Sequence, residues 1–135
     1  MRINCKGKLI DLSEPKIMGI LNATPDSFYE GSRLKTLDAA LKKAEEMLKF
    51  GADFLDVGGM STRPDSDEVS EEEELKRVVL LIEKISREFP ESLISIDTNR
   101  SKVAKESVEA GAAIVNDISA GSLDENMFKT VAKLQ

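Results

Sequence analysis

The feature that most constrains the fold is a regular alternation of short apolar-rich runs with longer segments of helical periodicity. The runs lie at residues 17–22, 53–57, 93–97 and 113–117, and each closes on polar residues or glycine. Such runs are typical of parallel strands that are buried on both faces. Between them, apolar side chains fall on one face of a helix: Leu37, Ala40, Leu41, Ala44, Met47 and Leu48, and then Leu75, Val78, Val79, Ile82 and Ile85. The sequence therefore predicts a β-α-β-α-β-α-β-α order.

Local signals predict where the helices begin and end. Ser70 followed by Glu73 matches a capping box, and Gly51 and Gly111 stand where a helix C-terminus favours a positive φ. A third helix is expected over residues 101–110. A fourth is expected to place four apolar side chains on one face: Met127, Phe128, Val131 and Leu134. We interpret the acidic run at residues 71–74 as a solvated helix start, where the helix dipole favours negative charge.

Alternating strands and helices with right-handed crossovers form either an open doubly wound sheet or a closed (β/α)8 TIM barrel. A barrel typically takes about 250 residues, so a chain of 135 residues would supply about the first four βα units. The local pattern does not separate these two folds. Residues 2–5 and 8–12, turning at Lys6-Gly7, predict an N-terminal β-hairpin suited to closing the bottom of the barrel.

Composition excludes several functional classes. The 19 basic and 25 acidic residues give a net charge of −6, which offers no electrostatic footprint for nucleic acid or an anionic membrane. No apolar run approaches the roughly 18 residues that span a bilayer. The single cysteine, Cys5, has no internal disulfide partner, and no apolar signal stretch follows the N-terminus. We therefore expect a cytoplasmic protein that binds neither nucleic acid nor membranes.

Polar residues gather where each predicted strand ends. Asn22 ends the first run, residues 58–63 follow the second, Asp97 ends the third, and Asn116 lies in the fourth. Parallel strands bring their carboxyl ends to one face of the sheet, where ligands of α/β folds bind. Strand ends are also polar simply because the chain must reach the surface there. Position alone therefore leaves a shared pocket and an ordinary surface equally open.

The amino-acid sequences of the loops favour a shared ligand pocket over an ordinary surface. The first loop reads Asn-Ala-Thr-Pro-Asp-Ser-Phe at residues 22–28, and the second reads Asp-Val-Gly-Gly-Met-Ser-Thr-Arg-Pro at residues 56–64. With Ser-Ile-Asp-Thr at 95–98 and Ile-Val-Asn-Asp-Ile at 114–118, they resemble the dihydropteroate synthases in order and spacing. The first two loop sequences are specific to the dihydropteroate synthases. The third and fourth motifs alone would also suit related pterin-dependent methyltransferases.

The resemblance implies the barrel rather than the open sheet, with residues 1–135 as the N-terminal half of a (β/α)8 TIM barrel domain. It also implies a transferase of folate biosynthesis. Such enzymes condense 6-hydroxymethyl-7,8-dihydropterin diphosphate with p-aminobenzoate, giving 7,8-dihydropteroate and pyrophosphate. Asp97 matches the family's pterin-binding aspartate, whose carboxylate accepts from ring N–H groups, and Asn116 matches its pterin-binding asparagine. Ile118 belongs to the same implied pterin site. Asn22 matches the residue that reaches a diphosphate-bound Mg²⁺, a hard cation that takes oxygen ligands.

The first two loops carry the remaining implied site residues. Thr62 and Arg63 match residues that bind the diphosphate, where a guanidinium can hold phosphate oxygens in bidentate fashion. Phe28 and Pro64 resemble apolar walls around p-aminobenzoate, and Glu30 keeps a carboxylate near the cationic intermediate of an SN1-like reaction. Catalysis is expected to depend on Asp97, Asn116 and Arg63. The resemblance also implies a homodimeric full-length protein.

The family's other site residues, an aspartate, a lysine and a late arginine and histidine, belong to strands five to eight. We therefore expect the isolated 135-residue chain to be inactive. The alternative is a non-catalytic half-barrel that binds or assembles. A pterin-dependent methyltransferase is a further alternative, but it has no need for the first two loops.

Overall fold

The computed structural model describes residues 1–23, 33–59 and 69–134, without the side chains of residues 33–35. Its centre is a parallel sheet in the order β3-β4-β5-β6. These strands are β3 (Met18–Asn22), β4 (Phe54–Gly58), β5 (Leu93–Asp97) and β6 (Ile114–Asn116). Each lies within one residue of a predicted strand at both ends, so the predicted strands are confirmed.

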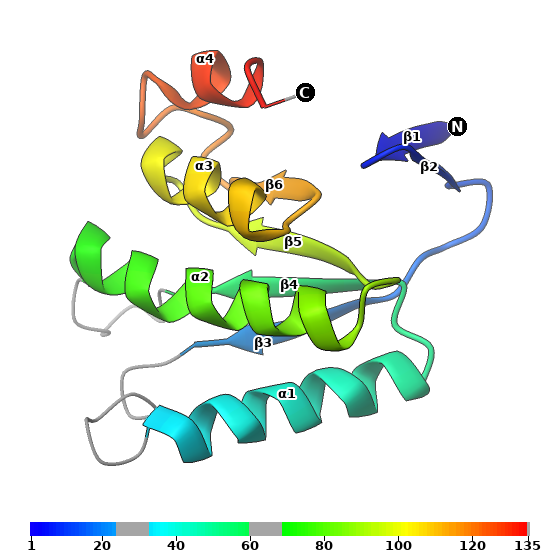
Figure 1. The fold of residues 1–135 in the computed structure, drawn as a ribbon. Helices are drawn as coiled ribbons and strands as arrows, with labels where there is room; N and C mark the ends of the chain where they lie inside the picture. The colour runs from blue at the N-terminus through cyan, green and yellow to red at the C-terminus, as the bar shows by residue number, and fades with distance from the viewer. Residues whose placement is uncertain (24–32, 60–68, 135) are drawn as a thin grey trace.

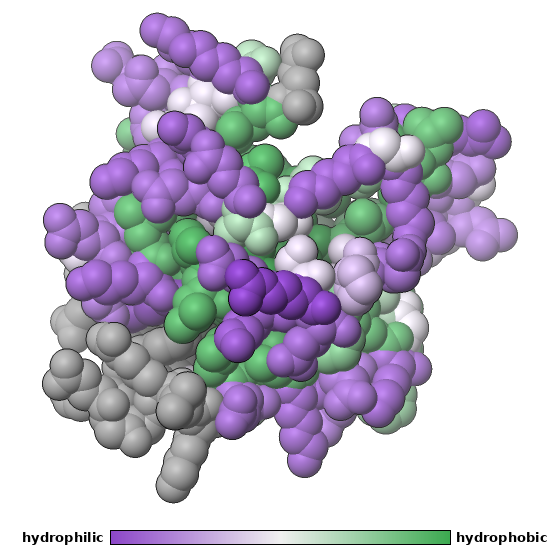
Figure 2. All heavy atoms as spheres, in the orientation of Figure 1, coloured by the Kyte–Doolittle hydropathy of each residue, from purple (hydrophilic) through white to green (hydrophobic). Residues whose placement is uncertain are grey.

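Three helices cover one face of this sheet: α1 (Arg33–Lys49), α2 (Glu71–Glu88) and α3 (Ser101–Ala110) (Figure 1). Their apolar faces meet side chains of the strands in one core, in which Leu55, Ile82 and Ile96 have no exposed surface. Hydrophilic side chains cover much of the outer surface of the helices, with apolar atoms visible between them (Figure 2). The sheet and its outer helices form the (β/α) architecture that the sequence predicts.

The predicted helix ends are confirmed at their caps. Ser70 is the N-cap of α2, and its hydroxyl accepts from the backbone N–H of Glu73 at 3.2 Å. Gly51 and Gly111 follow α1 and α3 with φ values of 95° and 136°, which glycine adopts without strain. The fourth helix, α4 (Met127–Val131), is shorter than expected. Met127 is buried, but Phe128 is 69% exposed, so the predicted apolar face is only partly used.

The N-terminal hairpin pairs β1 (Arg2–Cys5) with β2 (Lys8–Asp11) in antiparallel fashion. It lies beside the end of the sheet at which the parallel strands begin (Figure 1). The Lys6 ammonium donates to the Gly111 carbonyl oxygen at 2.7 Å, which ties the turn to the loop before β6. The hairpin therefore holds the predicted position at the bottom of the strands.

The sheet face away from the helices carries apolar side chains that solvent reaches. Met18 and Ile20 of β3 are 41% and 58% exposed on this face. They precede Asn22 at alternate positions, so all three side chains point to the same side. Within the described ranges, no helix is long and apolar enough to cross a membrane.

Candidate active site

The strand register places the predicted site residues in one row at the carboxyl ends of the sheet. Asn22 is paired with Gly58, Gly58 with Asp97, and Asp97 with Asn116. Paired residues of neighbouring parallel strands share a face, so Asn22, Asp97 and Asn116 project from the side away from the helices. The structure thus brings together three polar residues that the chain separates widely.

Gly58 leaves a gap in this row. A Cβ atom at this position would lie 3.6 Å from Oδ2 of Asp97 and 3.9 Å from Oδ1 of Asn22. These are ordinary contact distances, so a methyl group would fit without a clash and would fill the space between the two polar groups. The glycine keeps the floor of the site open between the carboxylate and the amide.

Asp97 lies in an acidic and partly buried environment. Burial raises the pKa of its carboxyl group, and the neighbouring carboxylates of Asp56, Glu74 and Asp117 raise it further. Each of these effects disfavours the ionised form of Asp97. A ligand that donates N–H groups, or that develops positive charge, would relieve this repulsion. The electrostatics of the row therefore favour a donor-rich or cationic ligand.

Asn116 has a buried partner that the sequence did not single out. Its amide Nδ2 donates to Oδ2 of Asp56 at 3.2 Å, and Asp56 is only 5% exposed. Asp56 stands in β4 two residues before Gly58, on the same face as the row. The one available signal was a carboxylate inside an otherwise apolar strand.

Behind the row, a buried ionic network holds the loop after β5 to the start of α2. Thr98 Oγ1 and Arg100 Nη1 donate to the two carboxylate oxygens of Glu74, each at 2.7 Å. Glu74 has no exposed surface. The interpretation of residues 71–74 as a solvated helix start is therefore wrong for Glu74. Its side chain turns inward because it lies one helical turn before Val78, on the buried face of α2.

Two arginines hold the described flanks of the second loop. Arg100 Nη2 donates to the carbonyl oxygen of Val69 at 2.8 Å, and Arg77 Nη1 donates to that of Gly59 at 3.4 Å. Gly59 and Val69 are the described residues on either side of positions 60–68. Arg100 belongs to the network around Glu74, whereas Arg77 forms a separate pair with Glu73.

The remaining predicted residues divide into two groups. Ile118 follows β6 at the same end of the sheet and is 79% exposed. Asp117 beside it accepts from the backbone N–H groups of Ser119 and Gly121 at 2.8 and 2.9 Å, so its carboxylate caps the local turn. The other predicted residues lie outside the described residues: Phe28, Glu30, Thr62, Arg63 and Pro64.

The row can be compared with the needs of the Mg²⁺ ion that the family resemblance implies. Within residues 1–23, 33–59 and 69–134, no group of three or more His, Cys, Asp or Glu side chains could hold a metal ion. Asn22 contributes a hard amide oxygen beside the gap at Gly58. Mg²⁺ keeps several waters and takes ligands from substrate phosphates, so one protein oxygen in an open gap suits it.

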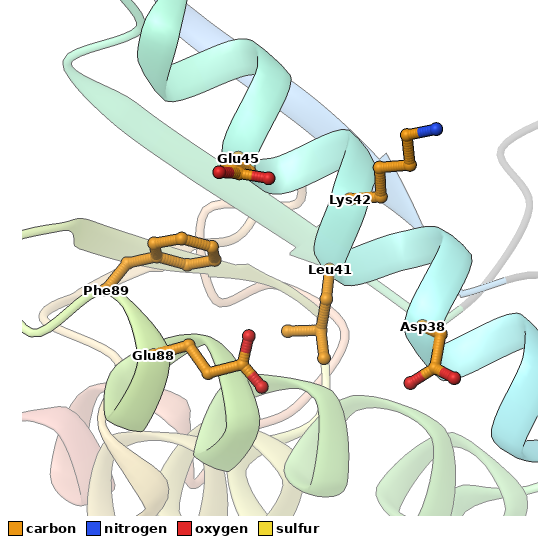
Figure 3. Close-up of a pocket in the computed structure, with 6 residues that line it drawn as sticks. All are labelled: Asp38, Leu41, Lys42, Glu45, Glu88 and Phe89. Carbon is orange, nitrogen blue, oxygen red and sulfur yellow. The ribbon is translucent and has the colours of Figure 1, made fainter.

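A cavity of about 450 Å³ lies elsewhere, between α1 and the C-terminal end of α2. Figure 3 shows its lining, in which Leu41 of α1 points toward Glu88 and Phe89, whereas the amino end of Lys42 points away from them. It lies on the helical side of the sheet, whereas the row with Asp97 projects from the opposite side. The cavity is therefore separate from the candidate site.

Comparison with known proteins gives the family. The family model described as pterin binding enzyme matches residues 18–135. The chain belongs to this family. It is 50% identical over 117 residues to the dihydropteroate synthase of Clostridium beijerinckii, covering 87% of this chain and 43% of that protein.

Solved structures of dihydropteroate synthases have the same fold as this family member. The Vibrio fischeri enzyme superimposes with a TM-score of 0.88 at 46% identity, over 99% of this chain and 47% of that one. The Xanthomonas albilineans enzyme with 4-aminobenzoic acid gives 0.87 at 39% identity, over 98% and 49%. The chain thus spans about half the length of these three relatives. The predicted resemblance to the N-terminal portion of these synthases is confirmed.

Proposed function

We propose that the protein acts as a dihydropteroate synthase. The amino nitrogen of p-aminobenzoate forms a bond to the exocyclic methylene carbon of the dihydropterin diphosphate. The bond from that carbon to the diphosphate oxygen breaks, pyrophosphate leaves with the electron pair, and the nitrogen releases a proton to solvent. The observation that carries the proposal is the row of Asn22, Asp97 and Asn116 at the strand ends of a pterin-binding family member.

The pterin ring would bind against Asp97 and Asn116. A pterin edge carries amino and ring N–H donors, which match the carboxylate of Asp97 and the amide oxygen of Asn116. Ile118, exposed at the same end of the sheet, offers apolar surface to the ring. The mutual repulsion among the carboxylates near Asp97 makes this pocket receptive to a ring that donates hydrogen bonds.

The same acidic surroundings would assist bond breaking. As the carbon–oxygen bond breaks, positive charge develops on the pterin side, and fixed negative groups near that charge lower the barrier. Among described residues, Asp97 and Asp56 are the carboxylates of this floor. No strong base is needed at the nucleophile, because an aniline nitrogen attacks in its neutral form.

The diphosphate would bind beside Asn22 and the second loop. Mg²⁺, held by the Asn22 amide oxygen and by the substrate, would supply neutralising charge to the departing pyrophosphate. Thr62 and Arg63 are proposed to bind the phosphate oxygens, on the strength of the loop sequence. The bonds of Arg100 and Arg77 support this role, because they hold Val69 and Gly59 on either side of that loop.

The p-aminobenzoate side of the site is proposed on the loop sequences and on a relative. The Xanthomonas albilineans enzyme binds 4-aminobenzoic acid. By similarity, Phe28 and Pro64 would hold the aromatic ring between them, and Glu30 would lie near the developing cation. A homodimeric state, cytoplasmic residence and the lack of nucleic-acid or membrane partners stay predictions from the sequence.

The test is turnover by the full gene product with pterin diphosphate and p-aminobenzoate, measured as both dihydropteroate and pyrophosphate. Asp97→Asn should reduce the rate at least about tenfold, because it removes one charge-assisted acceptor. Glu109→Gln is the matched control, since it neutralises an exposed carboxylate on α3. Pyrophosphate release without dihydropteroate formation, with p-aminobenzoate present, would contradict the proposed reaction.

A further inference from the structure

Asp56 occupies a position where packing alone would favour an apolar side chain. The register pairs it with Ile20 on one side and with Ser95 on the other, and Ser95 is paired with Ile114. The two polar residues therefore stand between isoleucines in one layer beneath the row of the active site. Asp56 is 5% exposed, and its Oδ1 has no hydrogen-bond partner within the described part of the chain.

A buried carboxylate with an unpaired oxygen costs stability, and an apolar residue of similar volume usually costs less. The hydrogen bond that Asp56 does make therefore indicates what the residue is for. Its Oδ2 accepts from Asn116 Nδ2 at 3.2 Å. An ionised carboxylate can only accept, so the Asn116 amide must turn its nitrogen toward Asp56. The amide oxygen of Asn116 then points away from Asp56 and can accept from a ligand.

We propose that Asp56 is a positioning residue that sets the hydrogen-bond polarity of Asn116 and thereby the choice of ligand. With its amide locked, Asn116 presents an acceptor beside the carboxylate acceptor of Asp97. Two neighbouring acceptors select a ring edge that carries an amino donor, as a 2-amino-4-oxopteridine does. They reject an edge in which an oxo group replaces the amino group. This inference rests on the proposed pterin site and adds the residue that determines its specificity.

The experiment compares the binding of free pterin with that of lumazine, its 2-oxo analogue, to the full gene product by calorimetry. Asp56→Asn keeps the shape of the side chain but allows the Asn116 amide to turn either way. We expect pterin to bind more weakly and the preference for pterin over lumazine to fall about tenfold or more, the equivalent of one hydrogen bond to a charged group. A purely structural role would weaken both ligands equally.

Two further variants sharpen the test. Ser95→Ala removes the neighbouring buried hydroxyl, which has no partner in the described ranges, and should leave the preference unchanged. The exchange Asp56→Asn with Asn116→Asp rebuilds the pair in reverse, because the new amide donates to a carboxylate at position 116. That carboxylate still presents an acceptor to the ligand, so the exchange should restore the preference for pterin.

The possible outcomes distinguish a failure of the role proposed for Asp56 from a failure of the proposed pterin site. An unchanged preference in Asp56→Asn, or an exchange variant no better than the single variants, would overturn the inference and leave the pterin site standing. If Asp56→Asn fails to fold, the exchange variant alone decides between these results. A wild-type protein that binds neither pteridine would overturn the proposed function, and the inference with it.

Discussion

Replacing Glu74 with alanine should destabilise the protein by about 3 kcal/mol, at the low end of the cost of breaking a buried ion pair. The carboxylate has no exposed surface and accepts two bonds of 2.7 Å, from Thr98 and Arg100. Its loss leaves a hydroxyl and a guanidinium without their acceptor. The Arg100 side chain is 21% exposed and keeps its bond to Val69, so solvent and that carbonyl oxygen offset part of the cost.

The assay is equilibrium unfolding of the full gene product in urea, followed by circular dichroism. Glu71→Ala is the matched control from the same helical turn. Its partner Lys102 lies 3.7 Å away and both side chains are about half exposed, so the loss should not exceed about 1 kcal/mol. If the two variants unfold at the same urea concentration, the network around Glu74 does not stabilise the protein as described.

Three further substitutions test the candidate site and the fold that supports it. Burial and neighbouring carboxylates raise the pKa of Asp97 in the folded protein, so folding favours its protonated form, and this contribution is lost as pH rises through the folded pKa. Asp97→Asn should therefore melt at a higher temperature than wild type at neutral pH, with the difference vanishing in acid; a lower melting temperature at neutral pH would refute the repulsion. Gly58→Ala should fold normally but lose about tenfold or more in affinity for free pterin, because its methyl group fills the gap 3.6 Å from Asp97. Unimpaired binding would show that the gap is not part of the site. Gly111→Ala should destabilise by about 1–3 kcal/mol, because φ is 136° and the new methyl group would lie 2.7 Å from the Ser86 hydroxyl; urea unfolding measures this, and a neutral effect would contradict it.

The sequence predicted the sheet and the first three helices well because each signal is local. Buried parallel strands need apolar runs, and the helix caps at Ser70, Gly51 and Gly111 depend only on nearby backbone. The row of Asn22, Asp97 and Asn116 was predicted because parallel strands bring their carboxyl ends to one face. These inferences required the fold class but no detailed packing.

Other features depend on contacts between distant residues. Asp56 was visible as a carboxylate in a strand, but its bond to Asn116 joins residues 60 positions apart. Glu74 lies one turn before Val78 on the apolar face of α2, a signal that the acidic run around it concealed. Phe128 had the spacing of a buried residue, yet its side chain on α4 is 69% exposed. Tertiary packing decided all three.

The most direct test of the central claim is the affinity of free pterin for the full gene product with and without the Asp97 carboxylate. If the strand-end row is the pterin site, Asp97→Ala should raise the dissociation constant by about tenfold to a hundredfold, the equivalent of one or more charge-assisted hydrogen bonds. An unchanged dissociation constant in a folded variant would contradict the assignment of this row as the pterin site.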